Sequence, residues 1–337
     1  MALYRPGMTP KRFPILFITA SRIGDAVLSS GLIKALVEQI PNARFTIVAG
    51  PLAAPLFVQT PRLDRVIVME KRSWGGHWYS LWQRVRGRRW GLIVDLRGSS
   101  ISRMLMRQRR AVYKSGGPVV HKVVEAARLL KLEGEPPTPT LYTSEDIETH
   151  AAALTRGEGP ILAIGPGTNW VGKTWPTERF SQVVRALLGP GGPLEGGRLM
   201  ILGGPEDRGL GVAVRGAVTK DRLIELAGKT DLLTAFAVLK HARLYIGGDS
   251  GLMHMAAAAG TPTLGLFGPS DERLYAPWGP ATRVVRGPRS FNDIRERDPH
   301  LNHAVCHMMD LSVPRVVAAA KALIADTAPG ASHDPDL

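Results

Sequence analysis

The sequence predicts an α/β protein with two doubly wound domains, each built on a parallel sheet. Short apolar runs that suit buried strands alternate with longer helical patterns along both halves of the 337-residue chain. A chain of this length can hold two ordinary domains, and 44% hydrophobic with 21% charged residues is typical of globular proteins. The alternation starts again after a stretch rich in glycine, at residues 155–160. We therefore expect one domain over residues 1–157 and a second over residues 158–337.

The same patterns place the individual elements. In the first half we expect strands at residues 14–19, 44–48, 65–69, 91–96 and 111–113, and helices at 25–38, 119–130 and 145–154. In the second half we expect strands at 161–164, 198–202, 223–225, 242–246 and 263–267, and helices at 177–187, 207–217, 232–241 and 252–259. The last predicted helix, at residues 314–325, is apolar on one side and can pack on either domain.

Composition restricts the class of protein further. No apolar run approaches the roughly 18 residues that a membrane-spanning helix needs. The apolar stretch near the N-terminus is only about seven residues long, which favours a first buried strand over a signal peptide. Cys306 is the single cysteine, so we expect no disulfide framework and a reducing compartment such as the cytoplasm.

Residues 247–262 are the most informative segment of the chain. The turn Gly-Gly-Asp-Ser-Gly follows the predicted strand 242–246 and opens a helix of small residues. Free N–H groups at a helix start and the positive end of the helix dipole together bind anions. Asp249 and Ser250 lie at the turn, and His254 follows within the first helical turns. A lone histidine is most often structural, but in this turn a contact to a phosphate or diphosphate is the favoured interpretation.

Asp25 lies at the end of the first predicted strand, beside Gly24, whose missing side chain lets a ligand approach the backbone. Capping of the helix start explains a carboxylate at this position equally well, so the local sequence leaves both roles open. The segment lacks the G-x-G-x-x-G pattern of dinucleotide sites, which counts against a dehydrogenase.

Two further loops follow strands of the second half. The loop at residues 165–176 offers backbone donors, hydroxyl groups and the positive charge of Lys173. Trp175 and Pro176 follow at once and break any helix there, which counts against a Walker P-loop and an ATPase. After the strand 198–202, a carboxylate of the Glu206-Asp207 pair can accept hydrogen bonds from a ribose diol, although helix capping alone also explains it.

Residues 71–122 form a strongly basic segment. They contain thirteen lysines and arginines and one acid, Asp95, with tryptophan and tyrosine interleaved. Such a segment attracts polyanions, namely nucleic acid, anionic lipid head groups or a phosphorylated glycan. A solubilising charged surface is the alternative, and the near absence of acids favours a functional role instead. A nucleic-acid-binding protein is a remote alternative, because no helix-turn-helix, zinc or RNA-recognition signature accompanies the segment.

Taken together, these segments resemble glycosyltransferase family 9, the ADP-heptose:lipopolysaccharide heptosyltransferases. The resemblance runs over residues 15–325, and its most specific parts are residues 22–36, 173–176, 203–207 and 247–271. It implies a GT-B fold, in which two Rossmann-like domains face each other across a cleft. It also implies inverting transfer without a metal or another cofactor, an N-terminal domain that binds the acceptor, and a C-terminal domain that binds the nucleotide-sugar donor.

The resemblance assigns roles to individual residues. The family's catalytic aspartate matches Asp25, and the lysine that meets the donor phosphate matches Lys173. The other implied donor contacts are Thr168, Glu206, Asp249, Ser250, Gly251, Leu252 and His254. Ser250 stands where threonine is common in the family, which keeps a hydroxyl. For an acceptor with phosphates and acidic Kdo sugars we expect a contact from Arg97, with Arg103, Arg107 and Arg110 as further candidates.

We therefore expect a glycosyltransferase of EC class 2.4 that moves heptose from ADP-heptose to the Kdo and heptose inner core of a lipopolysaccharide precursor. Asp25 would be the base, and Lys173 with the 249–254 turn would stabilise the diphosphate. We expect a cytoplasmic protein without a transmembrane segment or nucleic-acid partner, in peripheral contact with the anionic inner membrane surface. The alternatives are a family relative with another nucleotide sugar or glycan acceptor, and a nucleotide-sugar sensor, against which Asp25 and Lys173 count.

Overall fold

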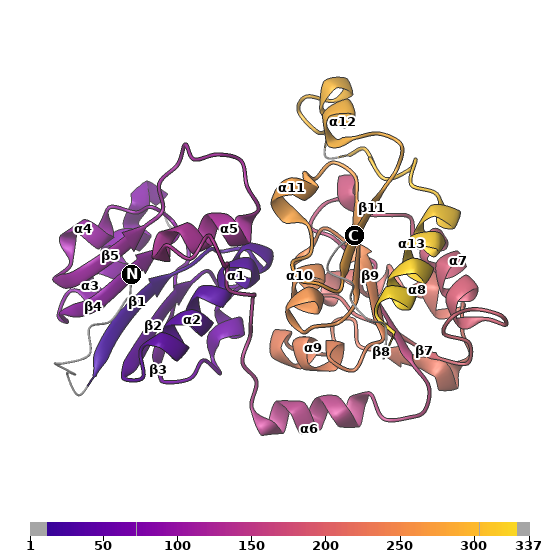
Figure 1. Cartoon of the computed structure of the whole chain (residues 1–337), viewed down its shortest axis with the longest axis horizontal. Helices are drawn as coiled ribbons and strands as arrows, with labels where there is room; N and C mark the ends of the chain where they lie inside the picture. Colours follow the sequence, from indigo (N-terminus) through magenta and orange to yellow (C-terminus); the bar gives the residue numbers. More distant parts are fainter. Residues whose placement is uncertain (1–11, 72, 303, 329–337) are drawn as a thin grey trace. The chain divides into compact units, whose positions relative to one another are not determined.

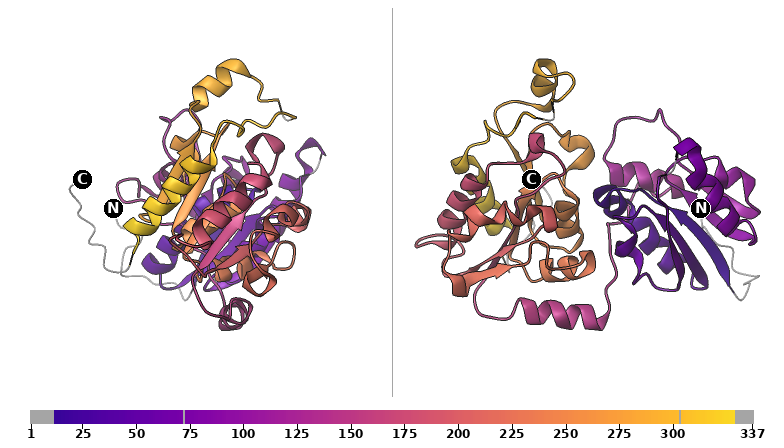
Figure 2. Two further views of the ribbon diagram at one scale, coloured as in Figure 1. Left: turned by 90° about the vertical axis from the view of Figure 1, so that its right-hand side faces the viewer. Right: turned by 180° about the vertical axis from the view of Figure 1, so that it is seen from behind.

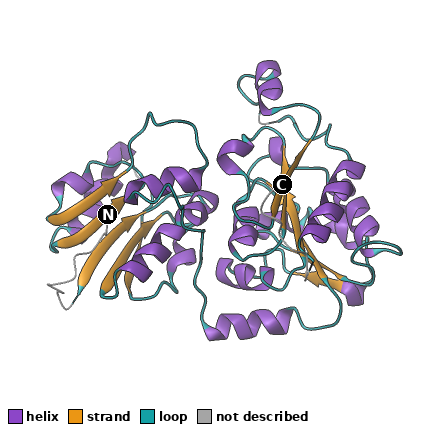
Figure 3. Cartoon of the chain, viewed as in Figure 1, coloured by secondary structure: helices purple, strands orange, loops and turns teal. Residues whose placement is uncertain are grey.

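The computed structural model describes residues 12–71, 73–302 and 304–328. Internal contacts divide the chain into two compact units, residues 1–144 and residues 145–337. Each unit contains one sheet whose paired strands are all parallel, with helices packed around it (Figure 3). Two parallel α/β domains are the fold class that the sequence predicts. No helix among the described residues is long and apolar enough to cross a membrane.

The first unit has a five-stranded sheet in the order β3-β2-β1-β4-β5 (Figure 1). Its strands are β1 (Phe13–Ile18), β2 (Ala43–Ala49), β3 (Leu63–Val68), β4 (Trp90–Asp95) and β5 (Arg107–Val112). Its helices are α1 (Ile23–Ser29), α2 (Gly31–Gln39), α3 (Gly76–Val85), α4 (Ile101–Met104) and α5 (Lys122–Ala127), with 3-10 turns at Ala54–Phe57, Ser73–Gly75 and Arg128–Leu130. The chain leaves β1 in one direction and returns to its other side at β4, so the strand order reverses between β1 and β4.

Apolar side chains hold these helices to the sheet. Leu81 and Val85 of α3 and Ile101 of α4 share one buried core with Ile18 of β1 and Ile93 of β4. Helices α1, α2 and α5 pack against one another. Nearly every residue of β1 is buried, because a central parallel strand is covered on both faces.

The second unit has a six-stranded sheet in the order β11-β10-β9-β6-β7-β8. Its strands are β6 (Ile161–Gly165), β7 (Arg198–Ile201), β8 (Leu223–Glu225), β9 (Leu244–Gly248), β10 (Thr263–Phe267) and β11 (Thr282–Arg286). Its helices are α6 (Glu145–Leu154), α7 (Thr177–Leu188), α8 (Gly211–Arg215), α9 (Leu232–Leu239), α10 (Gly251–Ala258), α11 (Glu272–Tyr275), α12 (Phe291–Arg297) and α13 (Val313–Asp326), with 3-10 turns at Val171–Lys173, Pro205–Arg208 and Lys220–Arg222. Here the strand order reverses between β6 and β9.

The last helix, α13, packs against α7, β10 and β11 of the second unit, and Figure 2 shows it in yellow beside α7. Val316, Ala320 and Leu323 of this helix enter the same apolar core as Phe180 and Val184 of α7. The apolar side that the sequence predicts for this helix is therefore buried within its own unit.

The connection between the units is fixed at both ends. On the first-unit side, the Thr140 amide donates a hydrogen bond to the Ser30 hydroxyl at 2.8 Å. On the other side, Arg198 of β7 donates hydrogen bonds to the carbonyl oxygens of Thr155, Arg156 and Gly157. Helix α6 packs on α9. The compact units consequently divide before α6, whereas the predicted boundary after residue 157 lies one helix further along the chain.

Several elements lie outside the predicted set, namely α3, α4, α11, α12 and β11. Strand β5 begins at Arg107, although the prediction begins it at residue 111. This strand is at the edge of its sheet, and its residues 108–110 are exposed, so no apolar run marks its first half. The helix predicted at residues 252–259 is observed as α10. The helix predicted at residues 119–130 is observed as α5, which is shorter than predicted and continues as a 3-10 turn.

Candidate functional site

The second unit brings two of the predicted loops together at one edge of its sheet. The loop after β6 and the turn after β9 follow neighbouring strands, and the strand order reverses between these two strands. At such a point the two crossover connections leave in opposite directions, and ligands of open α/β sheets bind there, at the carboxyl ends of the strands. Lys173 lies in the first loop and Asp249 in the second.

Asp249 is the centre of this arrangement. Its Oδ2 accepts hydrogen bonds from the Lys173 ammonium at 2.7 Å and from the Ser270 hydroxyl at 2.6 Å. The His254 Nε2 atom lies 3.6 Å from Oδ1. Only 9% of the Asp249 side chain and 20% of the Lys173 side chain are exposed. The structure thus brings together three predicted donor residues, Lys173, Asp249 and His254, and adds Ser270.

The charge state of Asp249 follows from its partners. Burial by itself would raise the pKa of this carboxyl, but the nearby His254 and the Lys173 charge outweigh burial and hold the pKa well below its usual range. Asp249 is therefore ionised at any physiological pH. A buried, ionised carboxylate with three neighbours that hold it acts as an anchor for Lys173.

The helix after the turn begins as the sequence predicts. Ser250 is the N-cap of α10, and its hydroxyl accepts a hydrogen bond from the Met253 amide at 3.4 Å. Gly251 and Leu252 form the first turn and are partly exposed, so their amides lie where a helix start offers unpaired donors. This helix start and Lys173 give the edge of the sheet two sources of positive potential.

Thr168 stabilises the loop of Lys173 through contacts within that loop. Its hydroxyl donates to the Trp170 carbonyl oxygen at 2.9 Å and lies 2.8 Å from the Thr174 hydroxyl. Thr168, predicted as a donor contact, therefore has partners inside its own loop. Glu206, by contrast, is exposed in the 3-10 turn after β7, where its carboxylate can meet a ligand. Its neighbour Asp207 instead accepts the Gly204 amide at 2.9 Å, and burial raises the pKa of Asp207.

Glycines in β6, in β9 and in the loop after β6 make room for side chains of the protein. A Cβ on Gly165 or Gly247 would overlap the hydroxyl of Tyr245, which is fully buried between them. A Cβ on Gly167 would overlap the carboxylate of Asp207. The Tyr245 hydroxyl has no hydrogen-bond partner among the described residues, although Ser250 is close enough to lower its pKa slightly against a larger rise from burial. Packing against Tyr245 and Asp207 therefore requires these three glycines.

The first unit places Asp25 at the equivalent position of its own sheet. Asp25 lies in the first turn of α1, directly after β1, and Arg22 is the N-cap residue. The carboxylate is partly exposed and has no hydrogen-bond or ion-pair partner among the described residues. Asp25 therefore does not cap the helix with its side chain, and its oxygens are available to a ligand.

Arg97 follows β4, the strand beside β1 at the reversal of strand order. The buried Asp95 shapes this loop, because its carboxylate accepts the Arg97 amide at 3.0 Å and the Ser99 amide and hydroxyl at 2.9 and 2.6 Å. Burial raises the pKa of Asp95, and these hydrogen bonds oppose that shift. The exposed Arg97 guanidinium lies 5.1 Å from the centre of the Trp78 ring, a cation–π contact that holds the side chain over α3.

The other three predicted arginines lie elsewhere. Arg107 is the first residue of β5 and pairs in register with Trp90, the first residue of β4, so it lies at the amino edge of the sheet. Its guanidinium donates to the carbonyl oxygens of Arg103 and Leu105 at 3.1 and 2.8 Å. Arg110 is exposed in the middle of β5. Arg103 is exposed in α4, further along the connection from β4 to β5, so only Arg97 of these four lies directly after the carboxyl end of a strand.

Comparison with known proteins identifies the family. The model of glycosyltransferase family 9 (heptosyltransferase) matches residues 89–303, more than half of the chain. The chain belongs to this family. It is therefore a glycosyltransferase, and its two parallel-sheet units are the domains of the GT-B fold that the resemblance implies.

Relatives agree over nearly the whole length. Lipopolysaccharide heptosyltransferase 2 of Salmonella typhimurium is 23% identical over 93% of this chain and 99% of its own. Lipooligosaccharide heptosyltransferase 2 of Haemophilus influenzae is 24% identical over 81% of this chain and 88% of its own. Among solved structures, ADP-heptose lps heptosyltransferase II of E. coli superposes with a TM-score of 0.72 at 22% identity, covering 93% of this chain and 99% of its own. The family 9 glycosyl transferase of Veillonella parvula gives 0.76 at 18% identity, covering 95% and 99%.

Sequence reasoning missed Ser270 as part of the site. Its loop, Gly268-Pro269-Ser270-Asp271, follows β10, the strand beside β9, and the only available signal was that position at a strand end. Ser270 is buried, and its hydroxyl donates its hydrogen bond directly to the Asp249 carboxylate.

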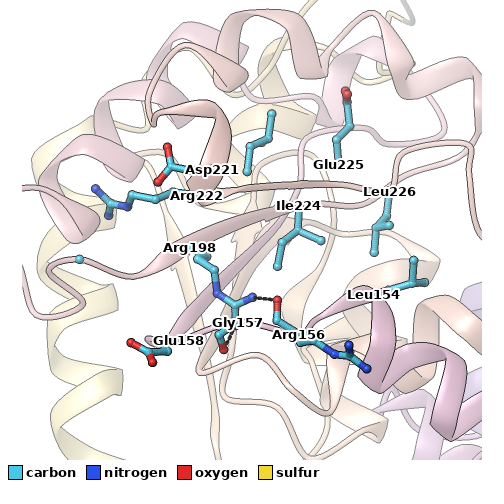
Figure 4. A pocket seen from close by; sticks show the side chains of 12 residues that line it. Leu154, Arg156, Gly157, Glu158, Arg198, Asp221, Arg222, Ile224, Glu225 and Leu226 are labelled. Atoms are coloured by element: carbon cyan, nitrogen blue, oxygen red, sulfur yellow. Dashed lines mark hydrogen bonds between the residues drawn. The ribbon is translucent and has the colours of Figure 1, made fainter.

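A hollow of about 490 Å³ lies at the opposite edge of the second sheet, where β7 begins (Figure 4). Arg198 is one of its lining residues, and Figure 4 shows the Arg198 guanidinium turned toward the backbone of Arg156 and Gly157. Its lining includes acids as well as arginines, for example Glu158 and Glu225. Such a mixed lining selects no ligand charge, and the role of Arg198 is to anchor the segment that follows α6.

Proposed function

We propose that this enzyme transfers heptose from ADP-heptose to the Kdo and heptose inner core of a lipopolysaccharide precursor. The relatives named above are lipopolysaccharide and lipooligosaccharide heptosyltransferases, which supports this donor and acceptor class. In this proposal the first unit binds the acceptor and the second unit binds the nucleotide-sugar donor. The transfer inverts the anomeric carbon and needs no metal ion or other cofactor.

The pair of Lys173 and Asp249 at the reversal of strand order is the observation that carries the proposal. A departing nucleoside diphosphate gains negative charge, and preformed positive groups in a protein stabilise that charge without rearranging. Lys173 is held by Asp249 at 2.7 Å, and α10 starts two residues after Asp249. We assign the diphosphate to Lys173 and the amides of Ser250, Gly251 and Leu252, and the ribose to Glu206.

Asp25 is the proposed general base. The acceptor hydroxyl oxygen attacks the anomeric carbon while the bond from that carbon to the diphosphate oxygen breaks with its electron pair. The hydroxyl proton passes to the Asp25 carboxylate. The absence of a partner for this carboxylate among the described residues supports the role, since an engaged carboxylate would be a poorer proton acceptor.

Arg97 is the proposed acceptor contact, because it is exposed and follows the strand next to the one that leads to Asp25. The face of α3 and α4 supports peripheral contact with an anionic membrane at the cytoplasmic face of the inner membrane. Trp74 in the 3-10 turn before α3, Tyr79 of α3 and Met104 of α4 are exposed among arginines, and aromatic rings with cations favour the interface of anionic bilayers. Sedimentation with phosphatidylglycerol vesicles should fall in a Trp74→Ala/Tyr79→Ala variant and be absent with phosphatidylcholine vesicles.

A panel of donors tests the proposed reaction. ADP-heptose, ADP-mannose, UDP-glucose and GDP-mannose are each incubated with Kdo-terminated and heptose-terminated core acceptors, with Asp25→Ala as the control. We expect turnover with ADP-heptose and loss of turnover in the control. Turnover with a different sugar nucleotide would favour the alternative family 9 activity with another donor. Turnover that survives Asp25→Ala would refute the assigned base.

A further inference from the structure

Residues 306–308 lie beside the proposed diphosphate site, although they are far from its loops in sequence. They follow β11 and α12, just beyond residue 303, where the match to the family model ends. We propose that these three residues, termed the 306–308 brace, position Lys173 and Ser270, which both donate to Asp249, for binding of the nucleotide-sugar donor. This inference rests on the proposed function and names additional residues for the same site.

The brace holds the lysine loop on both sides of Lys173. The Cys306 thiol donates a hydrogen bond to the Thr174 carbonyl oxygen at 3.2 Å, and the His307 amide donates to the Gly172 carbonyl oxygen at 3.1 Å. The two residues that flank Lys173 are thus each tied to consecutive residues of the brace. A 3-10 turn of three residues has little internal stability, so its position depends on such external hydrogen bonds.

Ring packing adds to these hydrogen bonds. The Trp170 ring lies edge-on to the His307 imidazole, with 6.1 Å between the ring centres. The same Trp170 ring fills the space that a side chain at Gly172 would take. The Trp175 indole donates to the Leu311 carbonyl oxygen at 3.0 Å, which continues the attachment beyond the lysine.

The brace also contacts the loop of Ser270. The Met308 sulfur lies directly against Gly268, so closely that a Cβ on that glycine would overlap it. Arg286 of β11 donates to the carbonyl oxygens of Gly268 and Ser270, both at 2.8 Å, and fixes the same loop. Met308 is 1% exposed, so this contact is part of the packed core.

Both hydrogen-bond donors of Asp249 therefore come from loops that the brace supports. Lys173 reaches Asp249 from the loop held by Cys306 and His307, and Ser270 reaches it from the loop held by Met308. A displacement of the brace changes the position of the lysine relative to the start of α10, and a diphosphate bound to both would lose part of its contacts. The three brace residues are positioning residues, because none is placed in contact with the donor.

Calorimetric titration tests the inference without requiring turnover. ADP, UDP and GDP are titrated into the wild-type protein, and the tightest binder is then titrated into Cys306→Ala and Cys306→Ser. Loss of one hydrogen bond to the loop should weaken nucleotide binding by about 3- to 10-fold in the alanine variant. Serine keeps a donor at this position and should restore most of the affinity. Met309→Ala, an exposed change in the same segment, should bind like the wild type.

Kinetic constants distinguish a positioning role of Cys306 from a role in stability alone. Cys306→Ala should raise the donor KM and leave the acceptor KM unchanged, whereas a loss of folded protein alone would lower kcat without changing either KM. Equal nucleotide affinity in Cys306→Ala and the wild type would overturn the inference and leave the proposed function standing. A wild-type protein that binds none of the three nucleotides would overturn both.

Because Cys306 is the only cysteine, covalent labelling gives a second test. The Cys306 thiolate attacks an alkene carbon of N-ethylmaleimide, the C–S bond forms as the π bond of the alkene breaks, and the neighbouring carbon takes a proton from water. The added group removes the thiol donor and must displace Thr174. We expect more than 10-fold weaker nucleotide binding after labelling, slower labelling in the presence of nucleotide, and no effect on Cys306→Ser. Labelled protein that binds nucleotide like unlabelled protein would contradict the brace.

Discussion

Replacing Asp249 by asparagine should destabilise the second unit more than any other single polar substitution in the site. The change removes the charge that pairs with Lys173 at 2.7 Å and replaces one carboxylate oxygen by an amide group. Lys173 and Ser270 both donate to Oδ2, so the amide oxygen of asparagine keeps both of them only when its NH2 group takes the place of Oδ1, near the His254 Nε2 atom. In this orientation the ammonium of Lys173 keeps an acceptor but loses the opposite charge of its ion pair.

The size of the effect follows from burial. Removing one partner of a buried ion pair costs about 3–5 kcal/mol. Lys173 is 20% exposed, so water partly solvates its ammonium after the change, and we expect about 2–4 kcal/mol in total. For a unit of this size that loss lowers the melting temperature by about 5–15 °C. Ser270→Ala leaves Asp249 its ion pair and should cost about 1 kcal/mol.

The pH dependence has a definite sign. The pKa of Asp249 is held below the ordinary value of about 3.9, so the folded unit binds this proton less readily than the unfolded chain does. The stability from Asp249 is therefore fully present above pH 4 or so and is lost as pH falls from about 4 through the depressed pKa. Asp249→Asn should remove this part of the acid dependence.

Urea unfolding followed by tryptophan fluorescence measures these changes, with Trp170 and Trp175 as probes in the second unit. A double-mutant cycle with Lys173→Met isolates the pair. The double variant should cost about 2 kcal/mol less than the sum of the single variants, because it leaves no unpaired charge. Additive costs, or a loss below about 1 kcal/mol for Asp249→Asn, would refute the anchoring role.

Three further predictions concern activity. Asp25→Asn should lower kcat by about 10²–10⁴-fold with nucleotide affinity unchanged in calorimetry, and unchanged kcat would exclude the proposed base. Arg97→Ala should raise the acceptor KM by about 10-fold without changing the donor KM, whereas Arg107→Ala should change neither, because it lies at the opposite edge of the sheet. Glu206→Gln should raise the donor KM by about 3- to 10-fold for ribonucleotides and less for the 2′-deoxy donor, and equal effects on both would contradict a ribose contact.

The fold was predictable because parallel strands that are buried on both faces give continuous apolar runs. β1, β4, β6 and β9 follow this rule, and all four were predicted close to their observed bounds. β5 did not follow it, since an exposed edge strand with the sequence Arg-Gln-Arg-Arg lacks an apolar period. Its register decides where the arginines lie, and sequence proximity alone had grouped Arg97 with Arg107, which the sheet separates.

The site was predictable where its residues follow the carboxyl ends of strands. It was not predictable where it depends on contacts between residues far apart in the sequence. Lys173, Asp249 and His254 were found from the loop and turn that carry them. Ser270 and the brace residue Cys306 belong to the same network through contacts across the fold, and no local pattern indicates such pairs. Gly165 and Gly247, in β6 and β9, also depend on such a contact, because their missing side chains make room for the Tyr245 hydroxyl.

The preformed pair also determines how Lys173 can act on a diphosphate. An ammonium group has three N–H donors. One points to the Asp249 carboxylate at 2.7 Å and one to the Asp249 carbonyl oxygen at 3.4 Å, which leaves one without a partner among the described residues. A phosphate oxygen can take this third donor while both contacts to Asp249 persist, so binding requires no exchange of partners. Because Asp249 offsets much of the lysine charge, the start of α10 must supply a large share of the attraction for the diphosphate. A Lys173→Arg variant should therefore bind nucleotide more weakly than the wild type although it keeps the positive charge. The flat guanidinium cannot direct donors to the carboxylate oxygen of Asp249, to its carbonyl oxygen and to a phosphate at once.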